Sequence, residues 1–124
     1  MIVPKNHPLS NHTEVSLKDL KEESFIVFNQ GDKDTMVSYS EFIGYTPKIS
    51  IEPNEVSMLG GLVAAGAGIT IVPNNPLLNT NTISIIKIKE DIGYRTIYMG
   101  WIKDSYMSPI AAKFRDFVIS LTNK

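Results

Sequence analysis

Three short apolar runs, separated by segments of helical periodicity, constrain the fold of this chain more than any other feature. The runs begin at Phe25, Ile49 and Ile69, and each ends at turn-forming residues or a proline. Strands that alternate with helices of this length require right-handed crossovers, so they lie parallel in one sheet. The sequence therefore predicts an α/β, Rossmann-like fold with a mostly parallel sheet flanked by helices.

Periodicity and cap residues predict the remaining elements. Apolar residues at helical spacing predict a helix from Thr35 to Ile43, which Gly44 would end in the left-handed conformation. Asn54 is expected to cap the following helix, and the glycine-rich residues 66–68 to end it. The other expected elements are an extended segment at 3–8, a short helix at the capping box Ser16–Asp19, strands at 25–28, 48–52, 69–72, 83–88 and 94–102, a loop at 74–82, and a helix after Ser108-Pro109.

The composition argues against several classes of protein. Twelve basic residues face 13 acidic ones, and acidic residues interrupt the densest basic stretch, which is Lys87, Lys89 and Arg95, so this chain is not expected to bind DNA itself. The absence of cysteine excludes disulfides and fits a reducing compartment. No apolar run approaches the roughly 18 residues that a membrane span needs, and the N-terminus lacks the apolar stretch of a signal peptide. We expect no membrane association and a cytoplasmic location.

The residues that could bind phosphate, bind a metal or act as an acid/base pair do not form a recognisable active site. The glycine-rich residues 60–68 lie between a helix and a strand, which is the wrong order for a phosphate loop. His7 and His12 are the only histidines, and neither has the spacing of a metal site. Glu52 and Glu55 are more readily explained as surface and helix-start acids than as an acid/base pair. No catalytic residue, metal or cofactor is predicted, and the chain is not expected to be an enzyme.

An ordered series of short motifs carries a more specific signal. It includes His7-Pro8-Leu9-Ser10, Gly44-Tyr45-Thr46-Pro47, the stretch LVAAGAGITIVP at 62–73, Trp101 and Ser108-Pro109. This series covers nearly the whole chain and resembles a truncated effector-binding domain of a LysR-type transcriptional regulator.

The resemblance implies a type 2 periplasmic-binding-protein fold, in which two α/β subdomains joined by crossing strands hold an inducer in the cleft between them. Residues 1–14 would be a hinge-crossing segment, residues 15–93 regulatory subdomain two, and residues 94–124 the return strand and C-terminal helix of subdomain one. The first half of subdomain one and the DNA-reading winged helix-turn-helix have no counterpart here. DNA would therefore be bound only through a helix-turn-helix absent from this chain.

The expected binding site lies outside the carboxyl ends of the strands, where such sheets hold their ligands. Amides at the helix start near residues 54–57 are expected to bind a carboxylate, so the effector would be an anionic small molecule. The predicted ligand-binding residues are Asn29, Gln30, Gly31, Glu55, Ser57, Val72, Pro73 and Asn74.

Two other functions share this scaffold. The first is a substrate-binding protein of a transporter, against which the missing signal peptide and lipid-anchored cysteine argue. The second is an enzyme, against which the missing catalytic set argues.

The C-terminal helix would normally pack on a sheet that this chain lacks, so its apolar stripe is expected either to fold back on subdomain two or to drive homo-oligomerisation. The stripe consists of Ile110, Phe114, Phe117, Val118 and Leu121.

Overall fold

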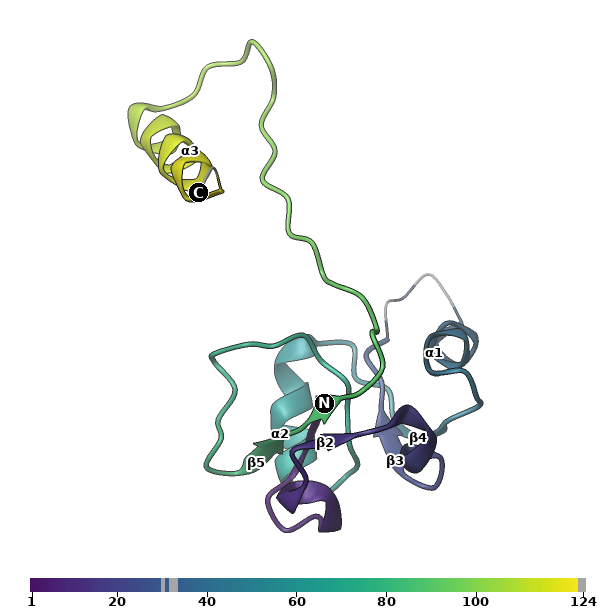
Figure 1. The fold of residues 1–124 in the computed structure, drawn as a ribbon. Coiled ribbons are helices and arrows are strands. Elements are labelled where there is room, and N and C mark those ends of the chain that lie inside the picture. Colours follow the sequence, from purple (N-terminus) through teal and green to yellow (C-terminus); the bar gives the residue numbers. More distant parts are fainter. Residues whose placement is uncertain (30, 32–33, 123–124) are drawn as a thin grey trace.

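Short strands and helices form the body of the molecule. The structure is a computed structural model that describes residues 1–29, 31 and 34–122 (Figure 1). The strands are β1 (Ile2–Pro4), β2 (Glu14–Val15), β3 (Ser24–Ile26), β4 (Lys48–Ile51), β5 (Ile83–Ile85) and β6 (Lys87–Ile88). The α-helices are α1 (Thr35–Ile43), α2 (Leu59–Ala64) and α3 (Pro109–Thr122), and the 3₁₀ helices are η1 (Pro8–Asn11), η2 (Leu17–Leu20) and η3 (Val56–Met58).

Residues 69 and 70 join two strand pairs into one layer. β3 pairs with β4 in parallel, and β1 pairs with β5 antiparallel. Between these pairs, Ile69 bridges Phe25 in parallel and Thr70 bridges Ile2 antiparallel. The order is therefore β4, β3, residues 69–70, β1 and β5, while β2 pairs in parallel with β6. The runs at Phe25, Ile49 and Ile69 lie side by side as predicted, so their carboxyl ends share one edge.

Several predicted strands differ in extent from the observed ones. The run 69–72 is reduced to two isolated bridges, and the predicted strand 83–88 is divided between β5 and β6. The strand predicted at 94–102 is wrong, because these residues form no regular structure and no other described segment pairs with them. A strand requires a neighbour that satisfies its backbone hydrogen bonds.

Two expectations about helix starts were also wrong. Asn54 does not cap the second helix, because Glu55 remains extended at φ −130° and ψ 127°. The chain then forms η3 first, and α2 begins only at Leu59. Near the N-terminus, Pro8 starts η1 rather than continuing an extended segment; proline is tolerated there because the first helical N–H has no intrahelical partner. The helix Thr35–Ile43, with Gly44 in the left-handed conformation, is confirmed.

Alternating side chains of the strands build a core on each face of the sheet. Phe25 and Val3 belong to one cluster of buried residues, whereas Ile26 and Ile2 belong to the other, with Val63 of α2. This alternation follows from the two-residue period of a strand. Phe25, Ile26 and Val27 are all less than 5% exposed, so burial of the first run on both faces is confirmed.

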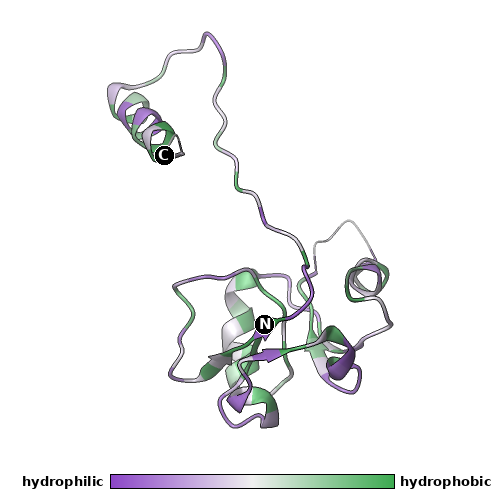
Figure 2. Cartoon of the chain, in the orientation of Figure 1, coloured by the Kyte–Doolittle hydropathy of each residue, from purple (hydrophilic) through white to green (hydrophobic). Residues whose placement is uncertain are grey.

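Helix α3 does not fold back on the body. Residues after β6 run outward as an extended segment that ends in α3, and no described element packs on the helix (Figure 1). Its apolar stripe is exposed, with Phe114 at 62% and Phe117 at 59% of their surface accessible. Figure 2 shows hydrophobic residues on α3 as well as in the inner strands and α2.

Gly68 fixes the approach of residues 69–70 to β3. Its φ is +156°, and a Cβ atom at this position would lie 2.5 Å from the carbonyl oxygen of Ser24. We predict that Gly68→Ala lowers the free energy of unfolding by about 2–4 kcal/mol, through backbone strain plus this clash. Urea denaturation measures the change. The matched control is Gly44→Ala, which has φ +84° but nothing near the added atom, and which should cost about 1–2 kcal/mol. Equal costs at the two positions would contradict the steric argument.

Glu90 ties the end of β6 to the start of η2. Its carboxylate accepts hydrogen bonds from the Ser16 hydroxyl and from the Leu17 N–H, the second at 3.0 Å. These bonds, the Ser16 bond above all, lower the pKa of Glu90 below its ordinary value of 4.5.

A lowered carboxylate pKa gives stability that is fully present above pH 4.5 and is lost as the pH falls through the lowered folded-state value. We therefore predict that Glu90→Gln destabilises the chain at pH 7 and that the difference from wild type shrinks toward pH 3. Thermal unfolding between pH 3 and 7 measures it. Glu14→Gln is the control, since the Glu14 side chain makes no hydrogen bond to any described residue. A difference that stays constant with pH would refute this role of Glu90.

Candidate functional site

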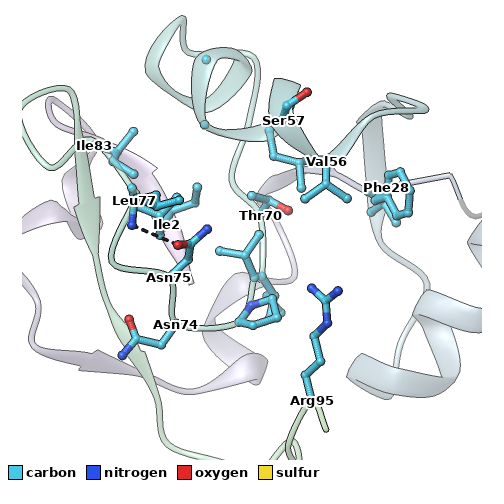
Figure 3. A pocket seen from close by; sticks show the side chains of 18 of the residues that line it. Ile2, Phe28, Val56, Ser57, Thr70, Asn74, Asn75, Leu77, Ile83 and Arg95 are labelled. Carbon is cyan, nitrogen blue, oxygen red and sulfur yellow. Dashed lines mark hydrogen bonds between the residues drawn. The ribbon is translucent and has the colours of Figure 1, made fainter. Parts of the chain in front are cut away.

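An open cavity lies where the parallel runs end. Its volume is about 1450 Å³, larger than the roughly 300–1,000 Å³ of enclosed small-molecule pockets, because it is partly open to solvent (Figure 3). Its lining comes from the end of β3, from α1, from η3 and α2, from residues 70–79, from the start of β5, and from the segment after β6. The predicted position at the carboxyl ends of the strands is therefore where the structure has its cavity.

The wall of the cavity is largely apolar. Phe28 projects from the chain just after β3, and Val56 from η3 faces it across the cavity (Figure 3). Leu59 of α2, Leu77 of the following loop and Ile97 of the outward segment contribute further apolar surface. Such a wall suits the hydrocarbon part of a ligand.

Several polar groups around the cavity already have partners. The Ser57 hydroxyl donates to the Glu55 carboxylate at 3.3 Å, and the Thr82 hydroxyl donates to the Asn79 carbonyl at 3.2 Å. The Asn75 side-chain oxygen accepts from the Leu77 N–H at 2.9 Å. These groups shape the loops and are less available to a ligand.

Thr70 and Arg95 also line the cavity, and neither side chain has a partner among the described residues. Thr70 is only 2% exposed, its backbone pairs with Ile2, and its hydroxyl has no hydrogen-bond partner among the described residues. Arg95 is the one charged residue among those that line the cavity within the described chain, and no described carboxylate lies within ion-pair distance of it. The cavity therefore combines an apolar wall with a single cation.

Tyr39 of α1 lines the cavity as a neutral group. Its ring packs edge-on against Phe25, with centroids 5.7 Å apart. Burial raises the pKa of the Tyr39 hydroxyl far above its ordinary value, so it remains protonated. The hydroxyl oxygen lies near the backbone of Ile71 but lacks a hydrogen bond of good geometry to any described residue.

The structure brings together four of the predicted site residues. Ser57, Val72, Pro73 and Asn74 line the cavity.

The other four predicted residues do not reach the cavity or cannot be placed. Asn29 instead forms a turn, in which its side-chain oxygen accepts from the Gly31 N–H at 2.8 Å. Glu55 lies outside the lining, and Gln30 lies outside the described residues. The Glu55 side chain makes no capping hydrogen bond to the amides at the helix start, and the carboxylate site expected there stays a prediction.

Sequence reasoning missed Thr70 and Arg95. Thr70 is the only polar residue inside the run 69–72, and a lone hydroxyl within a buried run is a signal that could have been used. Arg95 was interpreted as part of a solvated strand end, because nothing local shows that the chain after β6 passes the cavity.

An α/β domain with an open, mostly apolar cavity at the ends of parallel strands is, by architecture, a small-molecule-binding domain. A family model described as the LysR substrate binding domain matches residues 1–122. This chain belongs to that family, so the resemblance is confirmed and the transporter alternative is not favoured.

Named relatives and a solved structure agree with this assignment. YybE of Bacillus subtilis (strain 168), an uncharacterized HTH-type transcriptional regulator, is 33% identical over 97% of this chain and 42% of its own length. The transcriptional dual regulator GltC of the same organism is 30% identical over 99% of this chain and 42% of its own length. The effector-binding domain of QuiR, solved in complex with shikimate, superposes with a TM-score of 0.74 and is 29% identical, covering 97% of this chain and 58% of that chain.

The chain thus spans less than half the length of these two regulators. The type 2 periplasmic-binding-protein-like fold expected from the sequence is confirmed by the likeness to LysR effector-binding domains. No helix in the described part of the chain is both long and apolar enough to cross a membrane.

Proposed function

We propose that this chain is the inducer-sensing part of a LysR-type transcriptional regulator and that it binds a small anionic effector in the cavity at the strand ends. The observation that carries the proposal is the cavity itself, which has an apolar wall and a single charged lining residue, Arg95. Membership of the family and the shikimate-bound QuiR domain support it, since shikimate is a carboxylate. Binding rather than catalysis is favoured because no described carboxylate or histidine side chain lines the cavity.

A sensing role follows from where the cavity lies along the chain. Residues of the body line most of it, whereas Arg95 and Ile97 come from the segment that leads to α3. A ligand in contact with both parts favours one relative placement of them, which is a population shift. We assign residues 1–14 to the hinge crossing, 15–93 to subdomain two and 94–124 to subdomain one. The regulator would act in the cytoplasm and contact DNA through a helix-turn-helix outside this chain.

Titration followed by ¹⁵N–¹H correlation spectra tests the binding proposal, because this method detects even weak complexes residue by residue. We expect shikimate and benzoate at millimolar concentration to shift the amide signals of residues that line the cavity and to leave those of α3 unchanged. Val56→Asp should abolish these shifts by placing a negative charge in the cavity wall. Val37→Asp is the matched control, since Val37 is 53% exposed and Val56 is 54% exposed, but Val37 lies outside the lining. The absence of any shift with either carboxylate would overturn the proposal.

We also propose that the chain forms homo-oligomers through the exposed stripe of α3. Phe114 and Phe117 are each more than half exposed, and contiguous apolar surface of this kind usually marks an interaction site. Sedimentation velocity should give a sedimentation coefficient that rises with protein concentration, whereas Phe114→Asp/Phe117→Asp should remain a monomer. Lys113→Gln, a change at an exposed polar position of the same helix, should behave as wild type. A wild-type monomer at all concentrations would contradict this proposal.

A further inference from the structure

We infer that the Thr70 hydroxyl and the Arg95 guanidinium together anchor the carboxylate of a monoanionic effector, whose hydrocarbon body lies against the wall formed by Phe28, Val56 and Ile97. This inference rests on the proposed function of the cavity and goes beyond it by naming the anchor residues and the charge of the ligand.

The Thr70 hydroxyl is a donor that is open to the cavity and has no partner within the described chain. The residue is 2% exposed and lines the cavity, and both of its backbone polar groups are used: Ile2 N–H donates to its carbonyl at 2.9 Å, and its own N–H donates to the Ile2 carbonyl at 3.2 Å. Because the Thr70 hydroxyl oxygen is not among the fully buried side-chain atoms that lack a partner, it can donate a hydrogen bond to a ligand in the cavity.

Arg95 supplies the positive charge of the proposed anchor. It lies on the segment after β6, and its guanidinium extends into the cavity toward Thr70 and Val56 (Figure 3). The planar guanidinium presents parallel N–H donors that match a carboxylate, and no described carboxylate within the protein takes that place.

The lining determines the class of ligand. One guanidinium balances one negative charge, and no second cation lines the cavity among the described residues. A phosphate or dicarboxylate would therefore keep a charge without a counterion beside an apolar wall, which is unfavourable. The arrangement fits a monocarboxylate with an apolar or hydroxylated ring.

Affinity measurements on four variants test the anchor, with benzoate as the probe and neutral benzamide as its uncharged counterpart. Arg95→Gln should weaken benzoate binding roughly 10- to 100-fold and leave benzamide unchanged, because charge-assisted hydrogen bonds are lost. Thr70→Val, which keeps the side-chain shape, should weaken benzoate binding roughly 3- to 10-fold.

Each variant has a matched control. Lys103→Gln removes a cation from the same extended segment, but Lys103 does not line the cavity. Thr46→Val removes a threonine hydroxyl at an exposed position that does not line the cavity. Both controls should bind benzoate as wild type does. In the absence of ligand, Thr70→Val should unfold at the wild-type temperature or above, because its hydroxyl makes no bond within the protein.

The outcomes separate the inference from the proposed function. Benzoate shifts at the cavity that survive Arg95→Gln and Thr70→Val would overturn the anchor and leave the binding site intact. A benzamide affinity that falls in parallel with benzoate would also overturn it, because the loss would then be structural. No cavity shift with any carboxylate would overturn both.

Discussion

The hydrogen bonds of residues 69 and 70 to two different strands hold the body together. The Ile26 N–H donates to the Ile69 carbonyl at 2.8 Å, and the Ile2 N–H donates to the Thr70 carbonyl at 2.9 Å. The pair β3–β4 and the pair β1–β5 have no other backbone bridge between them among the described strands. Two residues therefore decide whether the sheet is one layer, and Gly68 permits the close approach that they need.

The same two residues also place the site. Because residues 69–70 run parallel to β3, the chain leaves the sheet at the same edge as Phe28, and the loop that follows closes around the cavity. The side chain of Ile69 points into one core cluster, so that of Thr70 points to the opposite face, where the cavity lies. The Thr70 hydroxyl therefore faces the cavity because side chains alternate along a strand. The backbone of the same residue joins the two strand pairs.

The sequence predicts well those elements that depend on local patterns of residues. The helix at 35–43, the capping box at Ser16 and Asp19, and the order of the three buried runs follow from periodicity and cap chemistry, and the structure contains them. Residues 94–102 do not form the expected strand. Strand propensity indicates only that residues suit a sheet, and no described segment pairs with these residues. Arg95 was missed for the same reason: its place at the cavity depends on the path of the chain after β6 and not on its neighbours in sequence.

The placement of Arg95 on a segment separate from the body has an energetic consequence for sensing. A ligand can shift a conformational equilibrium only by its difference in affinity for the two states. If Thr70 alone holds the carboxylate in one state and Thr70 and Arg95 together hold it in the other, the two states differ by one charge-assisted contact. Such a contact is worth about 1.5–3 kcal/mol. Since about 1.4 kcal/mol is a factor of ten, this contact changes the ratio of the two states by about 10- to 150-fold. A shift of that size converts a minor population into the major one, so one arginine on the segment after β6 would be sufficient for the proposed sensing role.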